Sequence, residues 1–415
     1  MHEQGIETRS YVKLLLLAAL LGAASAAVLF IFMLLVNTGV AAVWETGATA
    51  TGLPAPIFTL LVCTVGGLLV GIAVKGFGDH SGIFAELMAE FGRTGRFDYR
   101  HAPGIVVTAL ISLVSGGSLG PEAPMADACG GMGTWLADRL KLDPRQSRVL
   151  GFAGLSGMLA AFITSPFGGA VLALESARAA IAYAWTIFPS LVASSVATTV
   201  FLVLTNQFFG ALYTFPAYHP RITDLLLAVP LGLVGALAGV VFMLTFRWLR
   251  RLMAPLQRHL ILRGLIGGVG IGLAGAWMPL VLFSGEEQTL TLIESAASIG
   301  VLPLISLALV KLLVTSLLLA TGWKGGYIFP TMFASVALGL ATSLIFPAIP
   351  PAVAVAATMG GVMVATLKAP LFSALFVAIL VQSETAPVIA IAVIVSALAT
   401  TKFSMTPAPL PATEK

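Results

Sequence analysis

Long apolar runs recur along the whole chain, and they restrict the folds that it can adopt. The first extends from Leu14 to Val43, and others follow as far as Phe403. A helix of about 20 apolar residues crosses a bilayer, so each run is long enough for a membrane segment. Only 10% of the residues are charged, whereas soluble domains carry about a quarter. The sequence therefore predicts an all-α polytopic membrane protein and excludes a soluble globular one.

These segments predict one membrane domain over residues 1–415. Its first half is expected near 10–212 and its second half near 225–403, followed by a short Pro-rich cytoplasmic tail at 404–415. The segment at 104–138 is expected to form two half-helices, because its middle is rich in Gly and Pro. The predicted segments lie near residues 14–43, 53–75, 104–138, 147–164, 167–212, 225–246, 264–283, 300–320, 329–348, 352–368 and 369–403.

Basic residues gather in three loops between these segments. The positive-inside rule places such loops in the cytoplasm, so both termini are expected on the cytoplasmic side of a cell membrane. Membrane orientation also explains the formal charge of +4 better than nucleic-acid binding does. Two cysteines in apolar stretches provide neither a disulfide framework nor a Cys-rich metal site, and no cofactor is expected. The basic clusters are Arg93, Arg96 and Arg100; Arg139, Lys141, Arg145 and Arg148; and Arg247, Arg250, Arg251, Arg258 and Arg263.

An internal repeat is the most informative pattern in the chain. A Gly- and Pro-rich block ending at Pro124 is followed, 42 residues later, by Pro166 (166 − 124). A similar block ending at Pro330 is followed, 40 residues later, by Pro370 (370 − 330). Interrupted apolar segments at matching places in two halves indicate broken helices around a binding site near the membrane midplane.

Such breaks are suited to holding an anion. A helix that starts inside the membrane presents unpaired backbone N–H groups and the positive end of its dipole. No water relieves these donors in a bilayer, so an anion is a natural ligand. Three starts can converge on one site: the segment after His80-Ser81-Gly82-Ile83, the block Gly120 to Pro124, and the block Gly325 to Pro330. The Ser81 hydroxyl either caps its own helix or contacts the ion.

Glu122 is the most informative single residue. It lies at a helix start within an apolar region, where an ionisable group is a functional candidate by default. As a carboxylate it can occupy the anion site itself and leave when it is protonated, which would make it a gate. The alternative is a first-turn glutamate that only stabilises its own helix dipole.

The other charged residues in apolar segments have plainer interpretations. Lysines 311, 324 and 368 are expected to extend toward the membrane interface. Asp127 either assists proton movement or pairs with a neighbouring helix. Glu175 is expected near the cytoplasmic end of its helix, where it can pair with Arg178 at the (i, i+3) spacing.

In order along the chain, these motifs resemble the CLC family of chloride channels and chloride/proton antiporters, in its short prokaryotic form without C-terminal regulatory domains. The resemblance implies an inverted repeat of tilted and broken helices, and a homodimer with one anion pathway per subunit. It also implies bound chloride ions, a lipid bilayer around the protein, and Glu122 as the external gate. The residues that it places around the anion are Ser81, Gly82, Ile83, Gly120, Ala123, Gly326, Ile328 and Phe329.

The sequence departs from the family pattern at several places. Pro121 and Ala123 flank Glu122 where the family has a basic residue and a glycine, and His80 replaces a common glycine. The inner proton-transferring glutamate of the antiporters falls on Ser176, just after Glu175, and these two residues form the possible internal proton site. No tyrosine follows Tyr327, so the tyrosine that coordinates the central ion in the family has no counterpart.

The leading prediction is therefore transport of a small monovalent anion, chloride first, by a transporter and not an enzyme. Whether the protein is a channel or a proton-coupled exchanger stays open, and a fluoride transporter of the same family is an alternative.

The sequence Gly154-Leu155-Ser156-Gly157 matches the motif of rhomboid intramembrane proteases, with Ser156 as nucleophile. Such an enzyme needs a membrane-embedded histidine base, so helix packing by these glycines is preferred. A cation-coupled carrier would need more acidic residues near the midplane.

Overall fold

The computed structural model describes residues 8–80, 82–176, 183–206, 213–215, 219, 221–381 and 383–405. Over these residues the chain is almost entirely helical, and its only β-type pairing is a single bridge between Gly120 and Gly326. Seven of the described helices are long and apolar enough to cross a membrane. The prediction of an all-α polytopic membrane protein is confirmed.

The described residues form seventeen α-helices, α1 to α17. The long first helix continues through a π-helical turn, Ala41–Gly47, into the short α2. The α-helices are α1 (Thr8–Val40), α2 (Ala48–Thr51), α3 (Ala55–Phe77), α4 (Phe84–Thr94), α5 (Ala102–Val114), α6 (Glu122–Arg139), α7 (Pro144–Phe162), α8 (Pro166–Ser176), α9 (Tyr183–Thr205), α10 (Ile222–Leu252), α11 (Leu260–Trp277), α12 (Glu286–Ile299), α13 (Val301–Ala320), α14 (Ile328–Ile345), α15 (Pro351–Leu367), α16 (Pro370–Leu380) and α17 (Ala386–Ala399).

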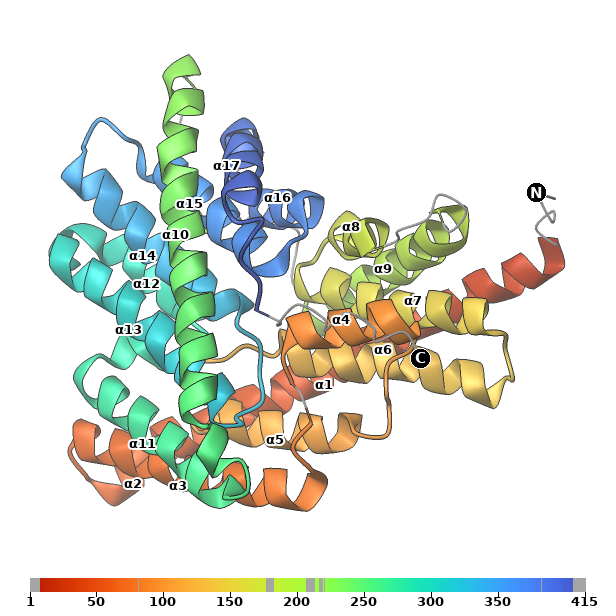
Figure 1. Ribbon diagram of the computed structural model, residues 1–415, viewed down its shortest axis with the longest axis horizontal. Coiled ribbons are helices and arrows are strands. Elements are labelled where there is room, and N and C mark those ends of the chain that lie inside the picture. Colours follow the sequence, from red (N-terminus) through yellow and green to blue (C-terminus); the bar gives the residue numbers. More distant parts are fainter. Residues whose placement is uncertain are drawn as a thin grey trace, which may run out of the picture.

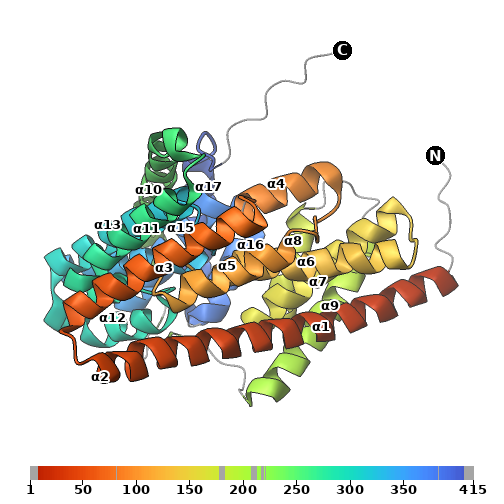
Figure 2. The same cartoon turned by 90° about the horizontal axis from the view of Figure 1, so that it is seen from below.

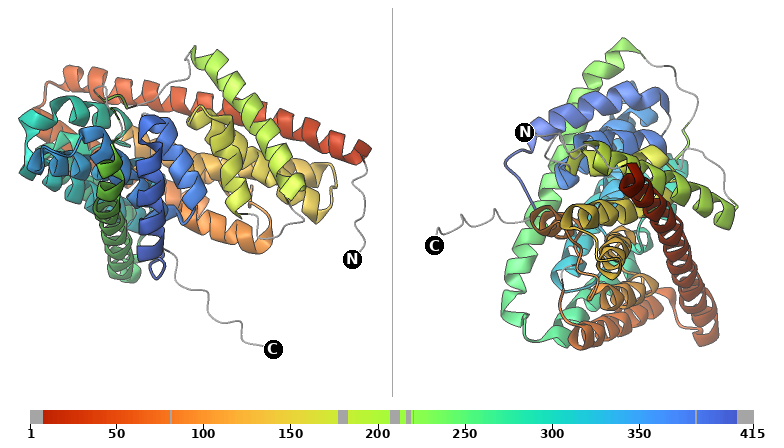
Figure 3. Two further views of the ribbon diagram at one scale, coloured as in Figure 1. Left: turned by 90° about the horizontal axis from the view of Figure 1, so that it is seen from above. Right: turned by 90° about the vertical axis from the view of Figure 1, so that its right-hand side faces the viewer.

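The helices of the two halves form two groups that meet in the middle of the molecule (Figure 1). Helices α6 to α9 pack together in one group, and α10 packs with α13, α15 and α17 in the other. Helix α1 runs along the length of the molecule (Figure 2). Helix α9 crosses α1 and packs against it (Figure 3). Helix α3 of the first half lies along α11 of the second, so the halves are interlocked.

Small residues allow the α3–α11 contact. A Cβ atom on Gly67 would lie 2.9 Å from the Cα of Gly268, and the reverse distance is also 2.9 Å. The two backbones therefore touch without side chains between them, as is common in membrane helix pairs. Large apolar side chains point outward instead, such as Leu237 and Leu398, which are 63% and 70% exposed. An apolar outer surface of this kind is suited to lipid.

The internal repeat predicted from the sequence appears as helices of matching length. Helices α6 and α14 both have 18 residues, and α8 and α16 both have 11. Pro124 and Pro330 each lie two positions after the first residue of their helix. Pro166 and Pro370 are each the first residue of theirs. Gly and Pro therefore mark equivalent helix starts in the two halves.

The segment boundaries were predicted less well. The break in 104–138 is confirmed, because α5 ends at Val114 and α6 begins at Glu122. The segments 167–212 and 369–403, each predicted as one segment, each contain two helices. Helix α12 was missed because its sequence carries Glu286, Glu287 and Glu294, which is too polar for a membrane span.

Candidate functional site

The starts of α6 and α14 meet at one point in the centre of the molecule. Gly120 and Gly326 each stand two residues before their helix, and they exchange two backbone hydrogen bonds. The N–H of Gly120 donates to Gly326 at 2.8 Å, and the N–H of Gly326 donates to Gly120 at 2.6 Å. Equivalent positions of the two halves are thus joined, and two positive helix ends point toward a shared region.

Glu122 fills this region. Its Oε1 accepts the backbone N–H of Ile328, the first residue of α14, at 2.6 Å. The residue is 1% exposed, and its Oε2 has no hydrogen-bond partner among the described residues. A hydrogen bond to a charged group is worth about 1.5–3 kcal/mol. The carboxylate of one half therefore occupies the helix end of the other, which is where an anion would bind.

Both bridge glycines are needed for this arrangement. A Cβ atom on Gly326 would overlap the carboxyl carbon of Glu122, and one on Gly120 would overlap its Oε2. Any larger residue at either position would push the carboxylate away. The Gly-rich sequence before each helix is thus explained by the space that the Glu122 side chain takes.

Two cavities lie beside residues that flank the bridge. A cavity of about 920 Å³ is lined by Leu119, Pro121 and the C-terminal end of α7. A second cavity of about 380 Å³ is lined by Gly82, Ile83 and Lys324. Leu119, which precedes Gly120, and Lys324, which lies two residues before Gly326, therefore line different cavities. Glu122 lies where these two chain segments meet.

The structure brings most of the predicted anion-binding residues together. Ala123, Ile328 and Phe329 are all buried at the two helix starts, beside the bridge glycines. Gly82 lies against Lys324, which stands two residues before Gly326: a Cβ atom on Gly82 would lie 2.9 Å from Cδ of Lys324. Ser81 lies outside the described residues. The helix after it begins at Phe84, and Ile83 is its N-cap.

Glu175 binds the start of a helix in the other half of the chain. Its Oε1 accepts the backbone N–H of Leu371 at 2.6 Å, and its Oε2 accepts that of Phe372 at 2.8 Å. The carboxylate therefore caps α16, and a first-half glutamate again binds a second-half helix start. Arg178 lies outside the described residues, and Ser176 is the last residue of α8.

Two lysines expected at the interface are buried instead. Lys311 is 0% exposed, and its Nζ donates to the carbonyls of Val281, Leu282 and Phe283 at 3.0, 3.0 and 2.8 Å. Lys324 is 5% exposed, and its Nζ donates to Asp79 and to the carbonyl of His80. The interface prediction is wrong for both, because each ammonium finds enough acceptors inside the protein.

Histidine 80 adds little positive charge at neutral pH. Its ring stacks on that of His101, with centroids 3.4 Å apart. Burial, His101 and Lys324 lower the pKa of His80, and Asp98 and Asp79 only partly oppose them. The pH-dependent charge expected beside the anion site therefore requires a pH below the usual range of histidine.

Ser156 lies in a helix-packing seam. It is buried in α7, and its hydroxyl has no hydrogen-bond partner within the described residues. Its carbonyl accepts the Ser194 hydroxyl of α9 at 3.2 Å. A Cβ atom on Gly157 would lie 3.1 Å from Cα of Gly22 in α1. Packing explains this motif, and nothing supports a protease.

The chain has helices that start inside the molecule, and the buried Glu122 carboxylate binds one of these starts. Two cavities lie near these starts. These features are typical of a polytopic membrane transporter. The family model described as "Voltage gated chloride channel" matches residues 66–401. The chain belongs to this family, whose members are CLC anion transporters. It is 25% identical over 342 residues to the putative ion-transport protein YfeO of Escherichia fergusonii, covering 80% of this chain and 79% of that protein. The YfeO protein of Shigella sonnei is 26% identical over the same length.

Solved structures have the same fold. A slow cyanobacterial Cl⁻/H⁺ antiporter superimposes with a TM-score of 0.82 at 20% identity, over 94% of this chain and 95% of that one. A CLC-type fluoride/proton antiporter superimposes with a TM-score of 0.75 at 20% identity, over 95% and 97%. The predicted CLC-like fold of tilted and broken helices is confirmed.

Proposed function

We propose that this protein moves chloride across the membrane through a pathway gated by Glu122. The observation that carries the proposal is the hydrogen bond between the Glu122 carboxylate and the Ile328 amide, at the N-terminal end of α14. A carboxylate and a chloride ion compete for the same N–H donors. When Glu122 is ionised it holds the site closed, and when it is protonated it loses its charge and an anion can take its place.

The two cavities support a pathway that passes this gate. The smaller one lies on the face that carries the basic clusters, since Arg250 and Arg263 line it. The clusters share that face: Arg96 pairs with Asp138 at 2.6 Å, and Arg250 pairs with Glu86. By the positive-inside rule this face is cytoplasmic, and both termini are proposed to lie there.

Proton coupling depends on whether Glu175 or Ser176 can pass a proton inward. Both oxygens of Glu175 accept backbone amides of α16, which supports a capping role for this carboxylate. The hydroxyl of Ser176 does not ionise near neutral pH, so it is a poor proton carrier. Uncoupled chloride conduction is therefore the form that we propose, with proton exchange as the alternative.

The test is ion flux in liposomes. The purified protein is reconstituted, chloride efflux is followed with a selective electrode, and internal pH is followed with a dye. We expect chloride efflux without uphill proton movement. Proton uptake driven by the chloride gradient would indicate an exchanger, and faster fluoride than chloride efflux would indicate a fluoride transporter. Absence of any anion flux would overturn the proposal.

We also propose that the protein is a homodimer in the bilayer with one pathway per subunit, as the family resemblance implies. Mass measurement of the detergent-solubilised protein, with the detergent contribution subtracted, tests this proposal. A monomeric mass would contradict it.

A further inference from the structure

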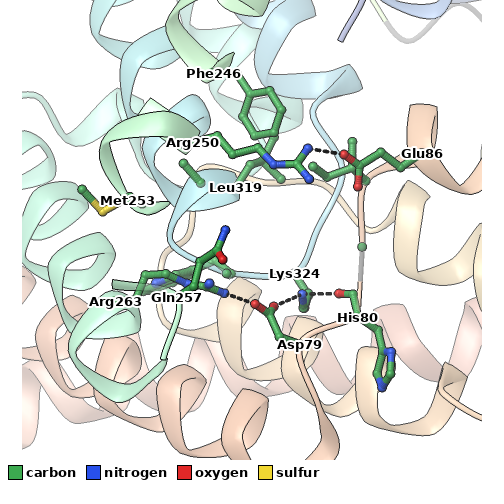
Figure 4. A pocket seen from close by; sticks show the side chains of 15 residues that line it. Asp79, His80, Glu86, Phe246, Arg250, Met253, Gln257, Arg263, Leu319 and Lys324 are labelled. Carbon is green, nitrogen blue, oxygen red and sulfur yellow. Dashed lines mark hydrogen bonds and ion pairs between the residues drawn. The ribbon is translucent and has the colours of Figure 1, made fainter. Parts of the chain in front are cut away.

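The two cavities differ in the charge of their lining. The cavity of about 380 Å³ on the basic face is lined by three cations, Arg250, Arg263 and Lys324 (Figure 4). The cavity of about 920 Å³ has no cation among its described lining residues, but it has three carboxylates, Glu45, Glu286 and Glu287. A negative lining opposes the entry of an anion. These carboxylates therefore need an explanation in a protein that moves chloride.

Of these three carboxylates, Glu286 is the one that acts on the gate. It is half-buried, whereas the other two are exposed. It lines the cavity together with Leu119 and Pro121, and Glu122 follows directly after Pro121. The charge of Glu286 interacts with Glu122. Since the described lining holds no cation to neutralise it, Glu286 and Glu122 repel each other when both are ionised.

The loop before α12 fixes the position of Glu286. Its backbone is joined to the loop before α6, because the N–H of Phe283 donates to the carbonyl of Gly116 at 3.2 Å. The ammonium of Lys311 in α13 donates to three carbonyls of the same loop, at residues 281–283. Glu286 follows three residues later as the first residue of α12. The backbone that carries this carboxylate is therefore anchored both to α13 and to the segment that leads to the gate.

The other side of the loop contacts α14, whose start binds the Glu122 carboxylate. Gly285, which precedes Glu286, has a φ of +98°, and a Cβ atom on it would lie 2.9 Å from the Cβ of Phe333 in α14. Glycine adopts this conformation readily and leaves room for this contact. The Phe333 ring also packs against Lys311, whose Nζ lies 4.8 Å from the ring centroid. The starts of α12 and α14 are thus held in a fixed relation to each other.

Other titratable groups face this pair of carboxyls from several elements. They are Glu287 and Glu294 of α12, Lys311 of α13, Asp127 of α6, Glu45, Tyr213 and Tyr327. Helix α14 carries no charged residue. The other glutamates are exposed, so water and salt screen their charges. The Lys311 ammonium is engaged by the loop carbonyls, and phenols stay neutral near pH 7. Glu286 is therefore the main variable charge on the cavity side of the gate.

We propose that Glu286 is a positioning residue for the gate: its negative charge drives the Glu122 carboxylate off the Ile328 amide and makes it easier to protonate. The charge that repels an entering anion thus also weakens the competitor for the anion's place. The effect on transport rests on the proposed function, whereas the interaction between the two carboxyls does not.

Glu286 changes its charge near neutral pH. Burial and the neighbouring Glu287 raise the pKa of Glu286 to about 7. Glu286 is therefore neutral in acid and negative in alkali, so it opposes the ionisation of Glu122 mainly at alkaline pH. Two interacting carboxyls titrate over a wider pH range than a single one. Wild-type flux should therefore fall with rising pH more gradually than one titrating group would produce.

The test measures chloride efflux from liposomes over a pH series. Glu286→Gln removes the repulsion, so Glu122 ionises at lower pH. The midpoint of the flux profile should move down by about one pH unit, the shift that one nearby charge gives, and the fall should become steeper. Glu286→Asp keeps the charge and should stay close to the wild type.

Glu287→Gln is the matched control. Glu287 lines the same cavity from the same helical turn, but it is exposed. Both glutamates lie at the positive end of α12, so each variant loses the same interaction with the helix dipole. A purely structural role for Glu286 would make the two variants alike, whereas we expect the midpoint of Glu287→Gln to stay in place.

A double variant shows whether Glu286 acts through the gate. Glu122→Gln is expected to conduct equally at every pH, and adding Glu286→Gln should leave that profile flat. If Glu122→Gln instead keeps a pH dependence that the second substitution removes, Glu286 acts directly on the anion, and the proposal is overturned.

A spectroscopic measurement separates this inference from the proposed function. Infrared difference spectra over the pH series report protonated carboxyl groups, and the band that Glu122→Gln removes belongs to Glu122. Its midpoint should move to lower pH in Glu286→Gln. This shift without any chloride flux would keep the interaction and reject the proposed function. Normal flux, with the same midpoint and steepness in Glu286→Gln as in Glu287→Gln, would overturn the inference and keep the function.

Discussion

Replacing Glu122 by Gln or Ala tests the central physical claim, which is that this carboxylate competes with the transported anion. Wild-type flux should fall as the pH rises, because the ionised side chain then holds the Ile328 amide. Protonation at low pH releases it, and flux increases. Glutamine cannot ionise, so Glu122→Gln should conduct equally at every pH, at a level near the acidic limit of the wild type.

The expected magnitudes follow from the hydrogen bond between Glu122 and the Ile328 amide, at 2.6 Å. A charged hydrogen bond is worth about 1.5–3 kcal/mol and a neutral one about 0.5–1.5 kcal/mol. Glutamine keeps an acceptor but loses the charge, a difference of about 1–1.5 kcal/mol, which corresponds to about five- to tenfold tighter chloride binding. Alanine removes the competitor altogether, so binding should tighten by roughly ten- to hundredfold.

The assay has two parts. Chloride efflux from liposomes is measured over a pH series, and chloride affinity is measured by calorimetry at alkaline pH. Asp127→Asn is the matched control, because Asp127 is another buried carboxylate of α6 and its Oδ2 also has no partner among the described residues. This control should keep the pH dependence. The reasoning is refuted if Glu122→Gln keeps the wild-type pH profile, or if affinity does not increase in the order Glu, Gln, Ala.

Three further changes probe the supports of the site. Gly326→Ala should expel the Glu122 carboxylate and flatten the pH profile of chloride flux. Gly92 has open space around it, so Gly92→Ala should keep the wild-type profile, and equal profiles for the two variants would contradict the predicted overlap between residue 326 and Glu122. Glu175→Gln should lower the stability of the protein by about 1–3 kcal/mol because α16 loses a charged cap, seen as a lower melting temperature, and the exposed Glu384→Gln should leave it unchanged. Lys311→Met should cost about 1–3 kcal/mol for each carbonyl left unpaired; a melting temperature equal to that of the wild type would show that these hydrogen bonds contribute nothing.

Much of the fold follows from local sequence features. Apolar runs predict the membrane helices because a helix satisfies all of its backbone hydrogen bonds within one segment. Gly and Pro predict the helix starts, and α6, α8, α14 and α16 begin at or within two residues of the predicted places. Glu122 was identified as a candidate because a carboxyl group in an apolar region is costly unless it has a task.

The partners of the charged residues were not predictable in the same way. Glu175 binds α16, 196 residues further along the chain. Lys324 reaches Asp79 across 245 residues. A lysine in an apolar segment looks the same in the sequence whether it extends to the interface or finds acceptors inside.

The sequence by itself determined that this chain lies in a membrane, that it repeats an interrupted pattern, and that one carboxyl group stands at an interruption. The tertiary structure alone decided that Gly120 pairs with Gly326 and that the Glu122 carboxylate meets the amide of the opposite half. It also decided that Arg263 and Lys324 are buried while Asp79, which pairs with both, stays accessible to water. The physical reason is that hydropathy and helix breaks are properties of neighbouring residues, whereas hydrogen bonds between the two halves depend on how their helices pack.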